Sequence, residues 1–430
     1  MKEVVIGFLG CGNIGCGVWE LLQSFNKDIV HRDDVHITIK KMLVRDVNKQ
    51  RNSPVPRELL TTEPDEVLSD PEITLVAEFM GGEQPATDYM LRALHAGKTV
   101  VTANKVALAL NWHLLQAAAK ENKAGLYYEA SVCGAVPIIK TLTEALHANR
   151  ISCVMGIING TTNYILTEMM KRGCSYEEVL FDAQRLGLAE PNPSADVEGL
   201  DATYKLSIMA SLAFHARIPV DKIYRNGITK VTKEDIAYAD EMGYVIKLLA
   251  IAKRVGNTVE AHVYPTLIPR EHMLAGVNGA LNGVYIYGHA CKEMMLIGRG
   301  AGDMPTASAV VSDILQAVTH TQHSYPTFQN TKEPSPEMSF DDDWETEYFI
   351  RLSAIDKPGV LSEIAGSFAR NRVSIATLMQ KGNATPGGRV ALVLVTHKAH
   401  EMDLRSALRD LQSPDVSVDS MIRVEGRQPS

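Results

Sequence analysis

The sequence predicts an α/β protein of three domains, and three observations support this fold class. A short apolar run near the start is followed by a glycine cluster and then by apolar residues at helical spacing. Candidate strands and helices alternate over residues 1–130, which predicts a parallel sheet. Residues 347–427 give the order β-α-β-β-α-β, which is the ferredoxin-like split motif.

Composition excludes several classes of protein. The 430 residues exceed one ordinary domain, and 45% hydrophobic with 22% charged residues is typical of globular proteins. A formal net charge of −8 without a basic cluster argues against a nucleic-acid partner. The N-terminus lacks the pattern of a signal peptide, and no apolar run approaches the roughly 18 residues that span a bilayer. We therefore expect a cytoplasmic protein with no membrane partner.

The six cysteines are scattered without a C-x-x-C pair. This spacing indicates reduced thiols rather than a disulfide framework or a zinc site. Cys133 could be a nucleophile, but a small residue buried in a tight loop is the preferred interpretation.

The first domain, over residues 1–130, is predicted as a nucleotide-binding sheet of the Rossmann type. Its strands are expected at Val4–Leu9, Val35–Val44, Leu75–Met80, Thr99–Ala103 and Gly125–Val132, and its helices near Tyr89–Ala96 and Ala107–Glu121. A helix over residues 303–318, begun by Asp303 and Pro305, is expected to pack back on this domain.

Residues 131–302 predict an α+β catalytic and dimerisation domain, in which we expect helices at Val136–Ala148, Thr161–Arg172 and Leu200–Phe214. Residues 320–346 are polar and dotted with proline, which is typical of a linker. The third domain follows, with strands at Glu347–Ile355, Val373–Gln380, Arg389–Thr396 and Val416–Val424 and helices at Val360–Phe368 and Met402–Leu411.

Gly10, Gly12 and Gly15 form G-x-G-x-x-G between a predicted strand and a predicted helix. Such glycines allow a tight turn and let a pyrophosphate reach the helix N-terminus, so the motif predicts dinucleotide binding; a turn that serves only packing is the alternative. After the second strand, Asp46 could grip the ribose of NAD and Arg45 could accept the additional phosphate of NADP. We expect NADP, or use of both cofactors, although an exposed pair without a role also fits.

Two lysines are candidate catalytic residues. Lys105 directly follows a parallel strand, where open α/β sheets bind ligands, although a solvated loop lysine also fits. Asp201 and Lys205 lie one helical turn apart behind the acidic stretch "AEPNPSADVEG", where a surface ion pair would be worth only about 0.3–0.5 kcal/mol. An alcohol dehydrogenase needs a group that takes the hydroxyl proton, and a lysine with a lowered pKa can do so. Carboxylates opposite it would bind an ammonium group, which suits an amino-alcohol substrate.

The run from Ala183 to Lys205, A-x3-GLAEPNP-x2-DV-x-G-x-D-x3-K, resembles the signature of homoserine dehydrogenases that carry a C-terminal ACT domain. The segments "GTTNYIL", "VTANK" and "GAGDMPTASAVVSDI" are also similar to family segments. The resemblance implies interconversion of L-homoserine and L-aspartate 4-semialdehyde with NAD or NADP, in threonine, methionine and isoleucine biosynthesis. At Leu188 some members carry a tyrosine, so a hydroxyl contact to the substrate is in doubt here.

The resemblance also implies roles for particular residues. Lys205 would be the proton donor and acceptor, with Asp201 and Lys105 as the other catalytic residues. The substrate would be held by Glu190, Asp196, Asp201, Thr161 and Gly160, with Glu190 on its ammonium. The residues that we predict for cofactor binding are Gly10, Gly12, Asn13, Ile14, Gly15, Arg45, Lys105, Gly187 and Gly302. A structural sodium ion would be bound by Glu129 and by the backbone carbonyls of Val132, Gly134 and Val136.

The third domain resembles ACT modules, which bind amino acids. Its turn "DKPGVL" matches their ligand loop and implies feedback inhibition by L-threonine, bound through Asp356, Gly359, Val360 and Leu361. A domain that only assists oligomerisation is the alternative, and we expect a homodimer or a homotetramer.

Two other functions fit part of the pattern. A related dehydrogenase could act on another amino-acid aldehyde, which a comparison of amino alcohols as substrates would reveal. A non-catalytic amino-acid sensor could combine a dinucleotide domain with an ACT domain, but the presence of Glu190, Asp201 and Lys205 together argues against it.

Overall fold

The computed structural model describes residues 1–320, 323, 333–381, 388–411 and 413–426. They form two compact units, and each is described by itself. The first comprises Met1–Asn159, Asp201–Ile223 and Ala280–Met338, and the second comprises Gly160–Leu200, Tyr224–Gly279 and Ser339–Ser430. No helix in the described part of the chain has both the length and the apolar character that crossing a membrane requires.

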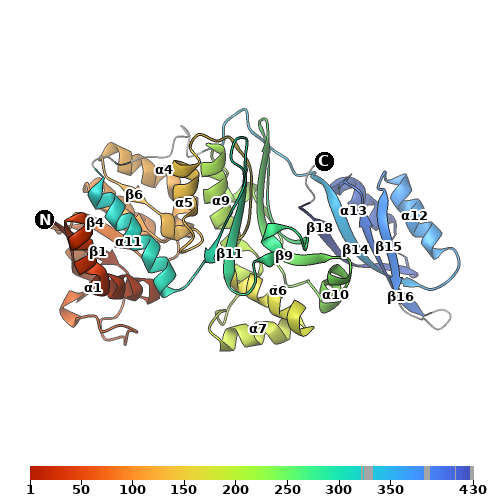
Figure 1. The fold of residues 1–430 in the computed structure, drawn as a ribbon, viewed down its shortest axis with the longest axis horizontal. Coiled ribbons are helices and arrows are strands. Elements are labelled where there is room, and N and C mark those ends of the chain that lie inside the picture. Colours follow the sequence, from red (N-terminus) through yellow and green to blue (C-terminus); the bar gives the residue numbers. More distant parts are fainter. Residues whose placement is uncertain (321–322, 324–332, 382–387, 412, 427–430) are drawn as a thin grey trace. The chain divides into compact units, whose positions relative to one another are not determined.

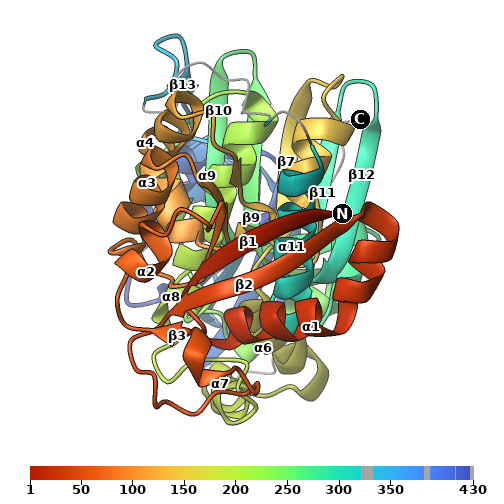
Figure 2. The same cartoon turned by 90° about the vertical axis from the view of Figure 1, so that its left-hand side faces the viewer.

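The first unit begins with a parallel sheet in the order β3-β2-β1-β4-β5-β6. Its strands are β1 (Lys2–Leu9), β2 (Val35–Leu43), β3 (Leu60–Thr61), β4 (Leu75–Glu78), β5 (Thr99–Thr102) and β6 (Leu126–Tyr127). Figure 2 shows β1 and β2 side by side. The crossover helices are α1 (Asn13–Asp33), α2 (Asp65–Leu68), α3 (Ala86–His95) and α4 (Lys105–Glu121). The predicted parallel α/β domain is confirmed.

Helix α11 (Asp303–Thr319) lies beside α1 on this sheet, although it is far along the chain (Figure 1). Its Val310 and Ile314 are fully buried in the core that β1 also builds. Gly17 of α1 permits the close approach, because a Cβ there would lie 2.9 Å from the backbone oxygen of Asp303. The prediction that this helix packs back on the first domain is confirmed.

Two predicted elements of this region differ from the structure. The strand expected over Gly125–Val132 ends at Tyr127, and a 3-10 helix over Glu129–Ser131 follows. The helix expected over Val136–Ala148 begins only at α5 (Ile138–Lys140) and continues as one π-helical turn over Thr141–Ala145. Pro137 disfavours helical backbone in the residue before it, which delays the helix start.

The first unit also contains an antiparallel sheet in the order β12-β11-β7. Its strands are β7 (Ile151–Ile157), β11 (Leu281–Gly288) and β12 (Lys292–Arg299). Helix α9 (Leu200–Phe214) is buried along nearly all of its length from Asp201 onward. Apart from Asp201 and Lys205 its residues carry no charge, and they are mostly apolar or small, which is typical of a helix inside a protein.

The second unit begins with α6 (Gly160–Arg172), α7 (Tyr176–Arg185), α8 (Ser194–Val197) and α10 (Lys233–Glu241). A long hairpin of β9 (Tyr244–Val255) and β10 (Thr258–Pro269) follows, and the short strands β8 (Tyr224–Arg225) and β13 (Ser339–Phe340) pair with β10. The sequence did not predict β9, because its continuous apolar run cannot be told from a buried helix by periodicity alone. A 3-10 turn over Met273–Gly276 also belongs to this unit, whereas those over Arg57–Leu59 and Val220–Lys222 belong to the first unit.

The last part of the second unit has the predicted β-α-β-β-α-β order, with strand order β18-β14-β16-β15. Its elements are β14 (Glu345–Ile355), α12 (Val360–Arg370), β15 (Ile375–Lys381), β16 (Arg389–Thr396), β17 (Ala399–His400), α13 (Glu401–Asp410) and β18 (Val416–Val424). Both long helices contribute to one core, with Ile364 and Phe368 from α12 and Leu404 from α13 fully or almost fully buried. Strand β18 also pairs in parallel with β10.

The described part of the predicted linker contains regular structure. Residues 321–322 and 324–332 lie outside the described residues, whereas Ser339–Phe340 form strand β13 and Trp344 is buried. Polar composition therefore concealed a short strand, because two residues are too few to show periodicity.

Candidate functional site

The three motif glycines lie in the turn from β1 to α1, and each meets a different constraint. Gly10 has φ +104°, and a Cβ there would lie 3.1 Å from the carbonyl carbon of Phe79. A Cβ at Gly15 would lie 2.9 Å from the backbone oxygen of Gly10, whereas one at Gly12 would meet nothing within 4 Å. Packing thus requires the outer two glycines, while the middle one faces open space at the N-terminus of α1.

This turn fits a pyrophosphate. The N-cap of α1 is Gly12, which has no side chain to cap the helix, so the first backbone N–H groups, including those of Asn13 and Ile14, are available to an anion. Gly10 donates its N–H to the carbonyl of Leu43 at the end of β2, at 3.0 Å. Arg45 and Asp46 follow on the same sheet edge and are exposed, and Asp46 Oδ1 accepts the N–H of Asn48 at 2.8 Å.

Glu78, the last residue of β4, is a buried carboxylate that sequence reasoning missed. Its Oε2 accepts a hydrogen bond from Thr102 Oγ1 at 2.6 Å, and its Oε1 accepts from the N–H of Met80 at 2.6 Å and from Asn104 Nδ2 at 3.3 Å. Burial raises the pKa of Glu78, and these hydrogen bonds oppose that shift. The sequence does contain a signal for it, because Glu78 is the one acid within the apolar strand "LVAEFM". A charge in a buried strand requires polar partners, which indicates a hydrogen-bond network around it.

Glu78 helps to fix the loop from which Lys105 projects. The neutral side chain of Asn104 donates to the carbonyl of Gly82 at 2.8 Å. It also caps α4 by accepting the N–H of Ala107 at 3.1 Å. Lys105 is the first residue of that helix. The ends of β4 and β5 and the start of α4 are therefore held together by one polar network.

Asp201 lies between two lysines. Its Oδ1 is 2.7 Å from Lys105 Nζ, and its Oδ2 is 2.7 Å from Lys205 Nζ. Asn159 Nδ2 donates to the same Oδ2 at 2.9 Å, and Lys205 Nζ donates to the carbonyl of Ile158 at 2.9 Å. Asp201 is 5% exposed and Lys205 is 9% exposed, which rules out the alternative of a solvated surface ion pair.

The electrostatics of this cluster favour an ionised carboxylate. Burial alone would raise the pKa of Asp201, but the positive charges of Lys205 and Lys105 outweigh burial and hold that pKa below its ordinary value. In the described part of the chain, Lys205 Nζ donates to two oxygens, those of Asp201 and Ile158. An ammonium has three N–H bonds, so one is left for a substrate oxygen.

The other predicted substrate residues belong to the second unit. Thr161 lies in the first turn of α6, which Gly160 begins, and its hydroxyl donates to the carbonyl of Leu188 at 2.8 Å. This bond brings Thr161 to the loop that carries Gly187 and the exposed Glu190. Gln184 Nε2 holds the loop by donating to the carbonyls of Glu190 and Pro191, each at 3.2 Å. The predicted Asp196 lies nearby in sequence, within α8.

The predicted sodium ligands share a buried turn of the first unit. Glu129 accepts the N–H groups of Ile139 and Lys140, each at 2.8 Å, and burial raises the pKa of Glu129 to about 7. The backbone is left-handed at Cys133 and Gly134, between the predicted carbonyl donors Val132 and Val136. Burial also raises the pKa of Cys133 to about 12, which agrees with a buried thiol rather than a nucleophile.

Gly302, a predicted cofactor residue, is the N-cap of α11.

The predicted effector residues surround the turn between β14 and α12. Gly359 has φ +96°, caps α12, and a Cβ there would meet nothing within 4 Å. Asp356 donates its N–H to the carbonyl of Gly388 at 2.9 Å. Val360 is buried and Leu361 is exposed. A small ligand could therefore approach the backbone of this turn closely.

Fold and site together define a class of protein. The glycine turn after β1 and Lys105 after β5 lie at the same edge of the parallel sheet, where such sheets bind ligands. A buried lysine with one N–H left for a substrate oxygen at this edge is suited to donate a proton as a carbonyl is reduced, and in its neutral form to take that proton back as the alcohol is oxidised. These features are those of a dinucleotide-dependent dehydrogenase.

Comparison with known proteins identifies the family. The model of the homoserine dehydrogenase family matches residues 137–315, and the model of the homoserine dehydrogenase NAD-binding domain matches residues 10–129. Homoserine dehydrogenase of Bacillus subtilis is 41% identical over 436 residues, which cover 99% of both chains. The chain belongs to the homoserine dehydrogenase family and is an NAD(P)-dependent oxidoreductase.

Solved structures agree with this assignment. The crystal structure of a homoserine dehydrogenase from Thiobacillus denitrificans has a TM-score of 0.91 and 38% identity, and the match covers 99% of each chain. A hyperthermophilic archaeal homoserine dehydrogenase in complex with NADPH has a TM-score of 0.65 and 25% identity, and the match covers 76% of this chain and 100% of the archaeal one.

Gly12 and Gly15 make a matched pair for testing the turn. Gly12→Ala should change the free energy of unfolding by no more than about 1 kcal/mol, because its Cβ enters open space, yet it should weaken NADPH binding. Gly15→Ala should lower the free energy of unfolding by about 1–3 kcal/mol, because its Cβ collides with the Gly10 carbonyl. Urea denaturation and fluorescence titration with NADPH measure the two effects. Unchanged NADPH affinity in Gly12→Ala would contradict the assigned ligand position.

Asp201→Asn should destabilise the protein, because it leaves the buried Lys205 without its counter-charge. We expect a loss of about 3 kcal/mol at pH 7, the lower end for a broken buried pair, since Lys105 is partly exposed. The pKa of Asp201 is held low in the folded state, so its contribution is present above the ordinary pKa of about 3.9 and is lost as pH falls further. The difference between wild type and variant in urea denaturation should therefore shrink below about pH 4.

The control for this variant is Asp182→Asn, since Asp182 pairs with the exposed Arg172 and Arg185. It should leave the urea midpoint unchanged. Equal effects of the two substitutions would mean that the Asp201 cluster is solvated in the working protein.

Proposed function

We propose that the protein interconverts L-homoserine and L-aspartate 4-semialdehyde. In the reduction the ammonium of Lys205 donates a proton to the aldehyde oxygen, and in the oxidation the neutral amine of Lys205 takes the hydroxyl proton. The observation that carries this assignment is the buried cluster in which Asp201 receives hydrogen bonds from Lys105 and Lys205. Asp201 fixes both ammonium groups, and the carbonyl of Ile158 fixes Lys205 from a second direction. The remaining N–H of Lys205 then defines the direction of a substrate oxygen.

The nicotinamide cofactor, when bound, supplies the two-electron chemistry of the reaction. Its pyrophosphate would be held by Gly10, Gly12, Gly15 and the first N–H groups of α1, at Asn13 and Ile14. Lys105 starts α4 at the same sheet edge and pairs with Asp201, so it would contribute both to the nicotinamide end and to the lysine cluster. We infer use of NADP or of both cofactors, since Arg45 is exposed directly after β2 and one archaeal relative was solved with NADPH.

The remaining substrate contacts in this proposal come from the signature motif. Glu190 would bind the ammonium of homoserine, since it is an exposed acid on a loop that Gln184 holds. Thr161 would bind from the start of α6, where Leu188 orients its hydroxyl. By family resemblance, Asp196 and Gly160 complete the substrate contacts, whereas Gly187 would contact the cofactor. A non-catalytic sensor would not need a carboxylate buried between two lysines.

We further propose that the β-α-β-β-α-β module is an ACT regulatory domain for L-threonine. Its strand order and the open, left-handed Gly359 support this assignment. We also propose a structural sodium ion on Glu129 and the carbonyls of Val132, Gly134 and Val136, supported by the turn that they share. A cytoplasmic homodimer or homotetramer acting in threonine, methionine and isoleucine biosynthesis completes the proposal.

Lys205→Met tests the assigned proton transfer. It keeps the volume of the side chain and should lower kcat by about 10²–10⁴-fold, while the Kd of NADPH should change less than about threefold. Initial rates with homoserine and with other amino alcohols, together with NADPH titration, provide the measurement. Lys171→Met, on the exposed surface of α6, should leave kcat unchanged. Equal loss of NADPH binding in Lys205→Met would contradict its role.

Asp356→Ala tests the effector turn. The threonine concentration for half-inhibition should rise at least about tenfold, because a charged contact to the effector is lost, while kcat without threonine stays the same. The exposed Glu363 on α12 provides the control variant Glu363→Ala, which should respond to threonine like wild type. Undiminished inhibition of Asp356→Ala would place the effector elsewhere, and a wild type that ignores threonine would disprove the regulatory proposal.

A further inference from the structure

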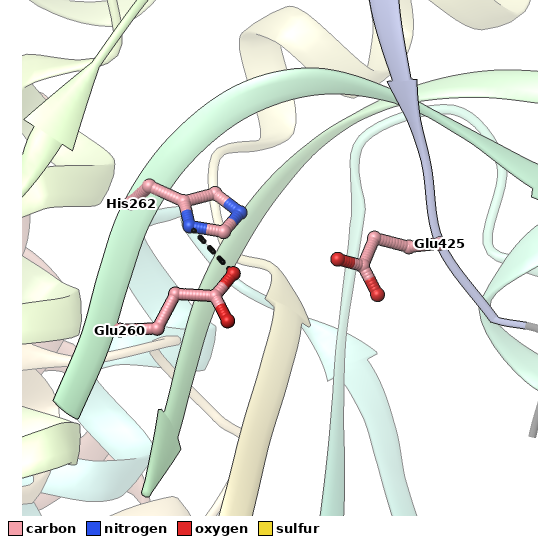
Figure 3. Close-up of side chains that lie close together, drawn as sticks. All are labelled: Glu260, His262 and Glu425. Carbon is pink, nitrogen blue, oxygen red and sulfur yellow. Dashed lines mark ion pairs between the residues drawn. The ribbon is translucent and has the colours of Figure 1, made fainter. Parts of the chain in front are cut away.

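We propose that Glu260, His262 and Glu425 form a binding site for a divalent transition-metal ion, with zinc as the best match to these ligands. One potential ligand atom from each residue lies within 4.8 Å of the other two. Figure 3 shows the three side chains directed toward one another, with His262 Nδ1 3.4 Å from Glu260 Oε1. This site involves neither the nucleotide turn nor the lysine cluster and does not depend on the proposed function.

Strand geometry places the ligands together. Glu260 and His262 are two residues apart on β10, so their side chains leave the same face of the strand. Glu425 directly follows β18, and its N–H donates to the carbonyl of Leu267 on β10 at 2.9 Å. The parallel pairing of β18 with β10 therefore brings Glu425 to a strand that is distant in the sequence.

His262 is the observation that points to a ligand. Its side chain is fully buried, and neither ring nitrogen makes a hydrogen bond within the described residues. Buried polar side-chain atoms are nearly always hydrogen-bonded, so two orphan nitrogens in one ring need an explanation. Burial lowers the pKa of His262 and keeps the imidazole neutral, which is the form that binds metals. The ring centroids of Tyr264 and Trp344 lie 5.4 and 4.7 Å from that of His262, so these two rings restrict the orientation of the imidazole.

Lys253 places an ammonium beside both carboxylates, where it would compete with a metal ion. It lies directly opposite Glu260 in the β9–β10 ladder, and its Nζ is 2.8 and 2.9 Å from the two oxygens of Glu425 but 3.9 Å from Glu260 Oε1. Its side chain is 32% exposed, so it can swing into solvent. One ammonium neutralises these two carboxylates incompletely and leaves the imidazole unsatisfied, whereas a divalent ion would satisfy all three groups.

The surrounding charges permit such an ion. Arg423 stacks over Tyr264 and Trp344, and its guanidinium pairs with the buried carboxylate of Glu401, which compensates its charge. Asp341 adds negative potential near Glu260. Imidazole nitrogen and carboxylate oxygen are both zinc ligands, and three protein ligands would leave the fourth tetrahedral position open for water. A bound ion would link β10 to the end of β18 and so fasten the last module to this strand.

Titration of the full-length, chelator-treated protein with Co²⁺ and competition by Zn²⁺ test the site. Wild type should bind one ion per chain, with the visible absorption of Co²⁺ held by nitrogen and oxygen ligands. His262→Phe, which keeps an aromatic ring between Tyr264 and Trp344, and Glu425→Gln should each weaken binding at least about tenfold. Lys253→Met should tighten it, because the competing ammonium is removed. The exposed Glu271 gives the control Glu271→Gln, which should bind like wild type.

Several outcomes would overturn the proposal. One is the absence of saturable binding by both wild type and Lys253→Met up to about 100 µM ion. A second is binding that neither His262→Phe nor Glu425→Gln weakens, and a third is a near-ultraviolet charge-transfer band, which would place the ion on a cysteine. Homoserine dehydrogenase activity, measured on the same samples, reports the proposed function separately from metal binding. If His262→Phe fails to fold, the partly exposed Glu425→Gln alone decides the result.

Discussion

The carboxylate of Asp201, buried between two lysines, is the constraint on which the arrangement of the first unit depends. A charged group is buried at tolerable free energy only when every charge has a partner at hydrogen-bonding distance. Lys105 comes from the first turn of α4, Lys205 from α9, one turn after Asp201, and Asn159 from the segment after β7. Three segments that are distant in the sequence must therefore meet at one pair of oxygens, which leaves the lysines little freedom.

A second buried carboxylate supports the first. Glu78 binds Thr102 and Asn104, and Asn104 caps the helix that Lys105 begins. On its other side, Phe79 donates its N–H to Leu9 at 2.8 Å and packs against Gly10. The nucleotide turn and the lysine loop are thus joined through the ends of β1, β4 and β5. A rigid sheet edge of this kind suits proton transfer, which requires the donor to be held at a defined position.

In the second unit, strand β10 pairs with strands from several parts of the chain. Strand β18 belongs to the β-α-β-β-α-β module, yet it also pairs with β10 through Thr266 and Leu267. The short strand β13 adds a further pairing to β10 from the region expected to be a linker. Backbone pairing therefore joins the module to the hairpin of β9 and β10. A displacement of β18 would act directly on β10.

Much of this protein follows from local sequence. The G-x-G-x-x-G turn, the alternation of strands and helices, the final β-α-β-β-α-β order and the signature motif all lie within short segments, so periodicity and turn chemistry reveal them. Tertiary structure alone decided the rest, because it depends on residues that meet only after folding. It buried Asp201 and Lys205, which look like a surface pair in sequence, and gave Glu78 its partners on β5. It also brought Glu425 to Glu260 and His262, because parallel pairing of β18 with β10 has no periodic trace in the sequence.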